Sequence, residues 1–344
     1  MIRATTGGVL KSYRSNLMNS FIRMNNATNT VLTQRVFNSY AEDPAAASKA
    51  FQLRRSYLRT ENQKSTNSAM IGKYETANSA LTSVINMVDN RKENSTLSAI
   101  LAGENDPTGD ARVALGKVLG QLGNSIVETM NSKYGSTFIF AGADGLNVPF
   151  EMTDEGLTYR GVLVDAPTGD DAAKLDYMSN ESYYVDIGLG FQWNEDSDEL
   201  FHSSGFDAAF QGINFLGYGV DEEGDPKNVV SLISRMADIL NNYSDEAWNN
   251  GGSEDFNRLA GKLEDAAQHL KTEHANKWAE TTMLRDNYDR LDDDMYTLTE
   301  QYGAIEDVDM AEAISDFLWA QYCYNAALKM GNSILPSSLM DYLQ

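Results

Sequence analysis

Apolar residues recur at alternating intervals of four and three residues in the stretch LRDNYDRLDDDMYTLTEQYGAI, residues 284 to 305. The repeat positions are Leu284, Tyr288, Leu291, Met295, Leu298, Tyr302 and Ile305. A seven-residue repeat of this kind predicts an α-helix with a narrow apolar seam of the coiled-coil type. A seam this narrow gives the helix no core of its own, so a second helix must cover it.

Long tracts without proline predict further helices. No proline lies between residues 45 and 106 or between 227 and 335, and proline is the residue that most strongly breaks a helix. Asp43 is a good N-cap and Pro44 suits a first helical position, so a helix is expected to begin there. From residue 44 to about 100 it would be roughly 85 Å long, which predicts a rod.

Two more helical tracts flank this rod in the sequence. Residues 4–36 carry the repeat positions Leu10, Tyr13, Leu17, Phe21, Met24, Thr28 and Val31. Near the other end the repeat shifts register around Gly303 and restarts at Met310, Ile314, Phe317, Gln321, Tyr324 and Leu328. The shift fits a hinge between two helical layers, and a simple stutter fits it as well.

The middle of the chain changes from a helical to an extended period. Between about 136 and 225 lie short runs such as TFIFA, LTYRGVLV and SYYVDIGLGF, with many glycines, which favour strands and turns. The predicted fold is mainly α with a β-rich insert, in which both chain ends build a long antiparallel helical or coiled-coil rod. The first helix is expected to cover residues 310–343, and the helix from 44 to 100 to cover 284–305. The predicted domains are a terminal helical layer (1–43 plus 306–344), a helical bundle rod (44–140 plus 227–305) and an outer β-rich insert (141–226).

Charge limits the partners that the chain can bind. The formal net charge of −23 disfavours nucleic acid and anionic lipid, because their phosphates would be repelled. Residues 1–41 contain no acidic side chain, whereas acidic side chains crowd 286–312. The two ends can attract each other, although two solvated faces explain the pattern equally well. The first residues lack a signal-peptide core and no run could span a bilayer, so we expect a cytoplasmic protein or one exported without a cleaved signal.

No catalytic, cofactor-binding or metal-ligating residue is predicted. His269 and His274 are five residues apart, not the four of a helical zinc pair. The carboxylates of DDD at 292–294 point about 100° apart on a helix and cannot converge on one ion. DEEGDPKN at 221–228 hints at a calcium loop but lacks its twelve-residue ligand pattern, so a turn is favoured. Cys323, the only cysteine, is favoured as a small core residue rather than a nucleophile.

Four stretches carry a more specific signal. They are AEDPAAASKAFQLRR (41–55) with its Asp43–Pro44 turn, NSKYGSTFIFAG (131–142), YVDIGLG through FQGINFLGYGVDEEGDPKNVV (184–230), and the terminal EDVDMAEA (306–313) with SSLMDYL (337–343). In this order, and with helical ends, they resemble the bacterial flagellin superfamily, most closely the hook-associated protein 3 type of the hook–filament junction. The resemblance covers nearly the whole chain.

The resemblance implies a structural adaptor without catalysis at the junction of flagellar hook and filament. Its terminal helices would line a tube and fold only on assembly, after export without a cleaved signal peptide. The implied partners are further copies of the chain, the hook-side junction protein, filament flagellin and a cytosolic export chaperone, with no nucleic acid and no membrane insertion. We expect the assembly surface to include Leu10, Leu17, Phe21, Met24, Ile314, Phe317, Leu339 and Leu343.

Other function classes stay open on the sequence alone. A filament flagellin is the nearest alternative, although the stretches at 41–55, 131–142 and 337–343 favour the junction type. A secreted coiled-coil adhesin would use the β-rich insert as its binding head. An enzyme inserted on a flagellin scaffold is the most remote alternative.

Overall fold

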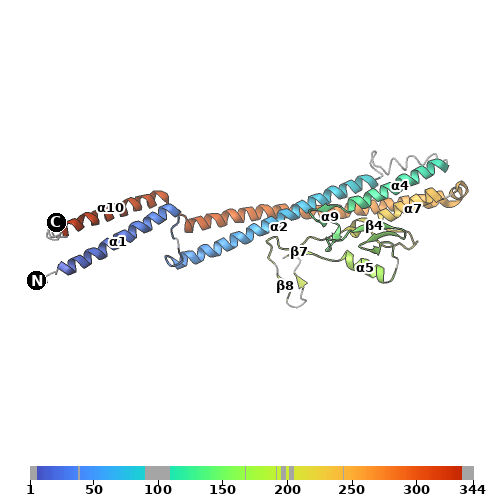
Figure 1. Cartoon of the computed structure of the whole chain (residues 1–344). Helices are drawn as coiled ribbons and strands as arrows, with labels where there is room; N and C mark the ends of the chain where they lie inside the picture. Colours follow the sequence, from blue (N-terminus) through green and yellow to red (C-terminus); the bar gives the residue numbers. More distant parts are fainter. Residues whose placement is uncertain are drawn as a thin grey trace. The chain divides into compact units, whose positions relative to one another are not determined.

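The chain is mainly helical in the computed structural model, which describes residues 6–37, 39–89, 109–166, 168–190, 192–194, 199–200, 205–242 and 244–334 (Figure 1). The long helices are α1 (Thr6–Thr33), α2 (Pro44–Val88), α4 (Gly109–Met130), α7 (Val229–Asn242), α9 (Ser253–Glu306) and α10 (Met310–Ile334). The short ones are α5 (Asp170–Ser179), α6 (Gly212–Leu216) and α8 (Asp245–Ala247), the last joined to α9 by a kinked turn at Trp248–Gly252. The part of the expected second helix beyond residue 89 lies outside the described residues.

Short antiparallel strands form the insert. They are β1 (Lys133–Tyr134), β2 (Thr137–Phe138), β3 (Ala141–Gly142), β4 (Phe150–Thr153), β5 (Gly156–Tyr159), β6 (Val162–Leu163), β7 (Tyr184–Val185), β8 (Trp193–Asn194), β9 (Glu199–Leu200), β10 (Phe206–Asp207) and β11 (Phe210–Gln211). One sheet has the order β4-β5-β6, and the other pairs are β1-β2, β3-β11, β7-β10 and β8-β9. The β3-β11 pair joins the beginning of the insert to its end. The predicted fold class, mainly α with a β-rich insert, is therefore confirmed, but the sequence did not predict α5.

Two compact units make up the chain, Met1–Glu61 with Asp292–Gln344 and Asn62–Leu291. In the first unit α1 and α10 pack along each other, since the Tyr13 hydroxyl donates to the Ala327 carbonyl oxygen (3.1 Å) and the rings of Phe21 and Tyr324 are 5.8 Å apart. Rising numbers on α1 meet falling numbers on α10, so the pair is antiparallel. The three-domain division made from the sequence stays a prediction.

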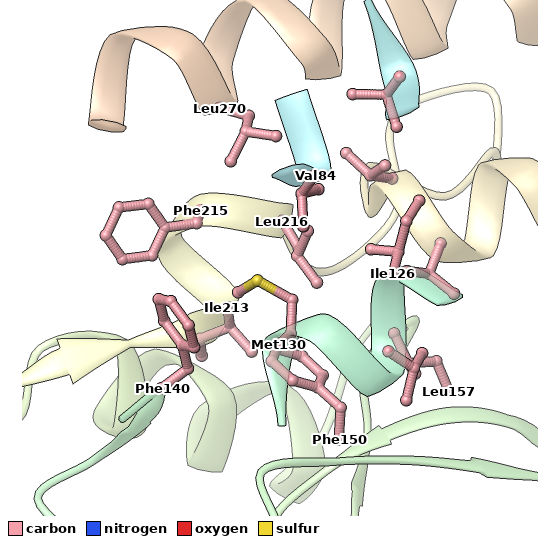
Figure 2. Close-up of a cluster of buried hydrophobic side chains, with 14 of the residues drawn as sticks. Val84, Ile126, Met130, Phe140, Phe150, Leu157, Ile213, Phe215, Leu216 and Leu270 are labelled. Carbon is pink, nitrogen blue, oxygen red and sulfur yellow. The ribbon is translucent and has the colours of Figure 1, made fainter. Parts of the chain in front are cut away.

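The second unit holds one large apolar core. Val84 of α2, Met130 of α4 and Leu270 of α9 meet insert side chains such as Phe140 and Phe150, all of them buried (Figure 2). A fully buried side chain of this size contributes about 1.5–3 kcal/mol. The insert is therefore part of the same core as the long helices that carry it.

Helix α2 pairs with α9, as expected for residues 284–305. In the second unit, buried Asn67 donates from Nδ2 to the Leu284 carbonyl oxygen (2.8 Å), and the Lys64 ammonium lies 4.8 Å from the centre of the Tyr288 ring. In the first unit, Arg54 donates to the Tyr302 hydroxyl. The order of these contacts makes this pair antiparallel too.

Candidate functional site

Small side chains form the face of α10 that packs against α1. Ala313, Ala327 and Gly331 are buried and Ala320 is half-buried. A Cβ atom at Gly331 would overlap the Tyr13 hydroxyl of α1, so the two helices approach closely where side chains are short. The large side chains of the sequence repeat are only partly buried in this seam, because two closely spaced helices leave little room for them.

The large apolar side chains of the pair divide between its seam and its outer surface. Leu17, Met24 and Phe317 are half-buried, whereas Leu10, Phe21 and Ile314 are exposed by 36–44%. Leu339 and Leu343 lie outside the described residues. The proposed role of these residues as an assembly surface is an interpretation of their chemistry and exposure.

Further large apolar side chains lie on the outside of the same two helices. They are Val9, Met18, Ile22 and Leu32 on α1, and Leu318, Trp319, Tyr322, Leu328 and Met330 on α10. Trp319 is 68% exposed and stacks on Tyr322 with ring centres 5.8 Å apart. Scattered exposed apolar residues are ordinary, but two neighbouring helices that both present many of them indicate an interaction surface.

A polar joint links the segment that follows α1 to the segment between α9 and α10. The Val36 amide donates to the Glu306 carbonyl oxygen (2.8 Å), and Arg35 forms a β-bridge with Asp307. The buried Glu306 carboxylate accepts from the Tyr302 hydroxyl and lies 3.6 Å from the guanidinium groups of both Arg35 and Arg54. The break between α9 and α10 is thus fixed to the break after α1 by backbone and charge together.

The remaining residues singled out by the sequence lie on α2 and α9. The Asp43 carboxylate accepts from the amides of Ala45 (3.0 Å) and Ala46 (2.9 Å), which caps the start of α2 at Pro44. Along the α9 seam, Leu284 and Leu291 are buried, while the other positions are half-buried: Tyr288, Met295, Leu298, Tyr302 and Ile305. Burial along this seam therefore decreases toward the end of α9.

The stretch YVDIGLG docks the insert onto the long helices. Asn287 donates to the Ile187 carbonyl oxygen (2.7 Å), and Gln63 donates to both carboxylate oxygens of Asp186 (3.1 and 3.2 Å). Gly188 has a φ of +89°, and a Cβ there would lie 2.9 Å from Cδ2 of Leu291. Only glycine combines this backbone conformation with so close an approach.

Two lysines share one aromatic ring where β11 meets the long helices. The ammonium groups of Lys73 and Lys277 lie 5.4 and 5.5 Å from the centre of the Phe210 ring. Lys73 also donates to the Ala208 carbonyl oxygen (2.7 Å). Burial and the neighbouring Lys277 charge lower the pKa of Lys73 to about 8. Burial raises the pKa of Tyr74, whose hydroxyl donates to Glu280 (2.6 Å).

The stretch DEEGDPKN forms a turn whose carboxylates converge. Asp221, Glu223 and Asp225 bring oxygens within 4.8 Å of one another, but the Lys262 ammonium lies 2.6 Å from an oxygen of each. Lys262 therefore occupies the position where a metal cation would bind. This ion pairing lowers the pKa of Asp221 to about 2. The sequence analysis did not predict this cluster, because Lys262 lies far along the chain from the three acidic residues.

The two described histidines are separately engaged. His269 lies on the wall of a cavity of about 760 Å³ beside Lys262, with its Nε2 2.9 Å from the Asn214 carbonyl oxygen. His274 Nε2 lies 2.6 Å from Oδ1 of Asn78, and burial lowers the pKa of His274. The structure thus pairs each imidazole with a polar group of its own surroundings. None of the helices in the described residues is long and apolar enough to cross a membrane.

The architecture defines a class: an α-helical chain whose two ends pair and whose middle carries a β-rich insert. Neither a family model nor a curated protein matches the sequence. Solved structures do share the fold. A structure described as a putative flagellar hook-associated protein from Vibrio parahaemolyticus has 15% identity and a TM-score of 0.50, covering 77% of this chain and 100% of that chain.

Two further solved structures have the same fold. Flagellar hook associated protein-3 from Legionella pneumophila has 11% identity and a TM-score of 0.53, covering 74% of this chain and 98% of its own. FlgL from Xanthomonas campestris has 13% identity and a TM-score of 0.50, covering 74% and 99%. At these identities the likeness establishes the fold that this chain shares with flagellar hook-associated proteins.

Proposed function

We propose that this chain is a structural subunit of the bacterial flagellum, an adaptor at the hook–filament junction with no catalytic role. The observation that carries the proposal is the apolar outer surface of α1 and α10, on which Trp319 is 68% exposed. Such a surface serves contacts with other helices rather than a solvated monomer. The fold shared with flagellar hook-associated proteins supports the flagellum as the assembly in which neighbouring subunits provide these helices.

The proposed mechanism is folding coupled to assembly. The α1–α10 pair meets through small side chains, so it buries little apolar surface by itself and needs neighbouring subunits to complete its packing. The chain is exported unfolded by the flagellar secretion apparatus, without a cleaved signal peptide and with a cytosolic chaperone on its terminal helix. Outside the cell it joins further copies, the hook-side junction protein and filament flagellin.

Immunogold electron microscopy with an antibody against residues 141–226 tests the location. We expect gold at a single point on each flagellum, where the hook meets the filament. Gold along the whole filament would instead identify a flagellin, the second candidate, because the same outer surface suits an indefinite polymer. Gold on the cell surface away from flagella would favour an adhesin and contradict any flagellar role.

Truncation after Met330 tests the terminal surface directly. The variant loses the end of α10 and all later residues, so we expect it to be secreted but to leave cells without filaments. Filament number per cell, counted by electron microscopy, is the measurement, and the chain itself is followed in the culture medium by immunoblot. Normal filaments built on the truncated chain would show that the proposed terminal interface is wrong.

A further inference from the structure

The α1–α10 pair has two flanks, which differ in charge. On each helix, one set of exposed positions directly follows the seam residues and another set directly precedes them. Because both helices are right-handed and the pair is antiparallel, the following positions of both helices lie on one side and the preceding positions lie on the other. The following side carries Arg14, Met18, Phe21, Ile314, Leu318 and Leu328; the preceding side carries Arg23, Glu312, Asp316, Trp319 and Met330.

Acidic groups are confined to one of these flanks. Glu312 and Asp316 are the only acidic residues in α1 and α10, and both lie on the preceding side, here called the acidic flank. The following side, here called the basic flank, carries Arg14 and no carboxylate. Arg23 on the acidic flank offsets part of its charge. Both flanks also present large exposed apolar side chains, so each can pack as well as pair charges.

Arg14 cannot reach these carboxylates within its own copy. It lies level with the end of α10, since neighbouring Tyr13 contacts Ala327, whereas Glu312 and Asp316 lie level with the end of α1. Arg14 is thus separated from Asp316 and Glu312 by about ten to sixteen residues, or about 15–24 Å along the pair. Within the described residues, the side chains of Arg14, Glu312 and Asp316 form no ion pair.

We infer that the basic flank of one copy packs against the acidic flank of a second copy. The second copy is shifted by about 20 Å along the helices, which brings its Glu312 and Asp316 to Arg14 of the first. Because two different flanks meet, the contact is heterologous and repeats from copy to copy, as a ring or helical layer requires. The inference rests on the proposed function, because it takes the outer surface of α1 and α10 as an assembly surface.

Cysteine crosslinking in isolated flagella tests which flanks meet. In a Cys323→Ser background, Met18→Cys marks the basic flank and Glu312→Cys marks the acidic flank, both at exposed positions that the inferred shift brings together. We expect the double variant to give a ladder of multimers with a short bismaleimide, and each single variant to remain monomeric. Asn25→Cys combined with Glu312→Cys is the matched control, since Asn25 also lies on the basic flank but about 14 Å out of step.

Three results would overturn the inference while leaving the proposed function in place. Dimers in a single variant would mean that like flanks meet, and a ladder from the Asn25→Cys control alone would mean a different shift. Assembled flagella without crosslinks in any variant would mean that other surfaces meet. Absence of the protein from flagella would instead remove the proposed function, and the inference with it.

Charge reversal provides a second measurement on the same contact. In the Met18→Cys, Glu312→Cys double variant, adding Arg14→Glu is expected to reduce the crosslinked fraction about twofold to fivefold, the range for one exposed ion pair. Adding Asp316→Arg to that variant is expected to restore it. Equal crosslinking in all three would show that Arg14 does not face the acidic flank.

Discussion

Replacing Gly188 by alanine tests how the insert is held on the long helices. The residue has a φ of +89°, and an added Cβ would lie 2.9 Å from Cδ2 of Leu291, 3.2 Å from Oε1 of Gln63 and 3.3 Å from Nη2 of Arg290. Leu291 is only 1% exposed, so its side chain has little room to move. The substitution therefore introduces both backbone strain and a clash.

The chain supplies a matched control two residues away. Gly190 has a φ of +79°, but nothing lies within 4 Å of a Cβ placed there. Gly190→Ala is expected to lower the free energy of unfolding by about 1–2 kcal/mol, the strain of a left-handed alanine. Gly188→Ala adds overpacking of about 1–3 kcal/mol, so we expect a total loss of about 2–5 kcal/mol.

Urea unfolding followed by circular dichroism measures both variants against the parent chain. A gap of at least about 1 kcal/mol between them would support the close approach of Gly188 to Leu291. Equal losses would mean that only backbone strain matters at both positions, and the described docking of the YVDIGLG stretch would be wrong.

Two further predictions concern buried charges. Folding lowers the pKa of Lys73 from 10.5 to about 8, so between these values the folded state binds fewer protons than the unfolded state. The free energy of unfolding should therefore rise by about 2 kcal/mol from pH 7 to 9.5. Urea unfolding at a series of pH values should show this rise in the parent chain and not in Lys73→Met. Glu306→Gln keeps the shape of the joint but removes the charge facing Arg35 and Arg54, so the free energy of unfolding should fall by about 1 kcal/mol. Thermal unfolding at low and at high salt measures this loss. An unchanged stability at low salt would contradict the ion pairing in the joint.

Helix positions followed from local properties of the chain. The tracts without proline became α2 and α9, and Asp43 caps α2 because a carboxylate at an N-cap satisfies free amides whatever lies elsewhere. The break around residues 306–309 also corresponds to the register shift in the repeat. These features depend on residues close together in sequence, so one sequence suffices to locate them.

Contacts between segments distant in sequence could not be predicted from local properties. Lys262 meets Asp221 and Asp225 through the packing of α9 against the loop before α7, and no local pattern announces that pairing. Likewise, Gly188 acquires its role only because Leu291 lies next to it. Such contacts are set by how helices and insert pack, which spacing within a segment does not encode.

Periodicity and helix-breaking residues are local physical signals, and they were enough to predict a chain that is helical at both ends and carries a β-rich insert. Which face of α10 is covered became known only from its packing against α1. The repeat favoured large positions such as Ile314 and Leu328, yet the buried face is Ala313, Ala327 and Gly331. The two helices approach closely enough that short side chains fill much of the seam beside Phe317 and Tyr324, and Ile314 and Leu328 are left facing outward.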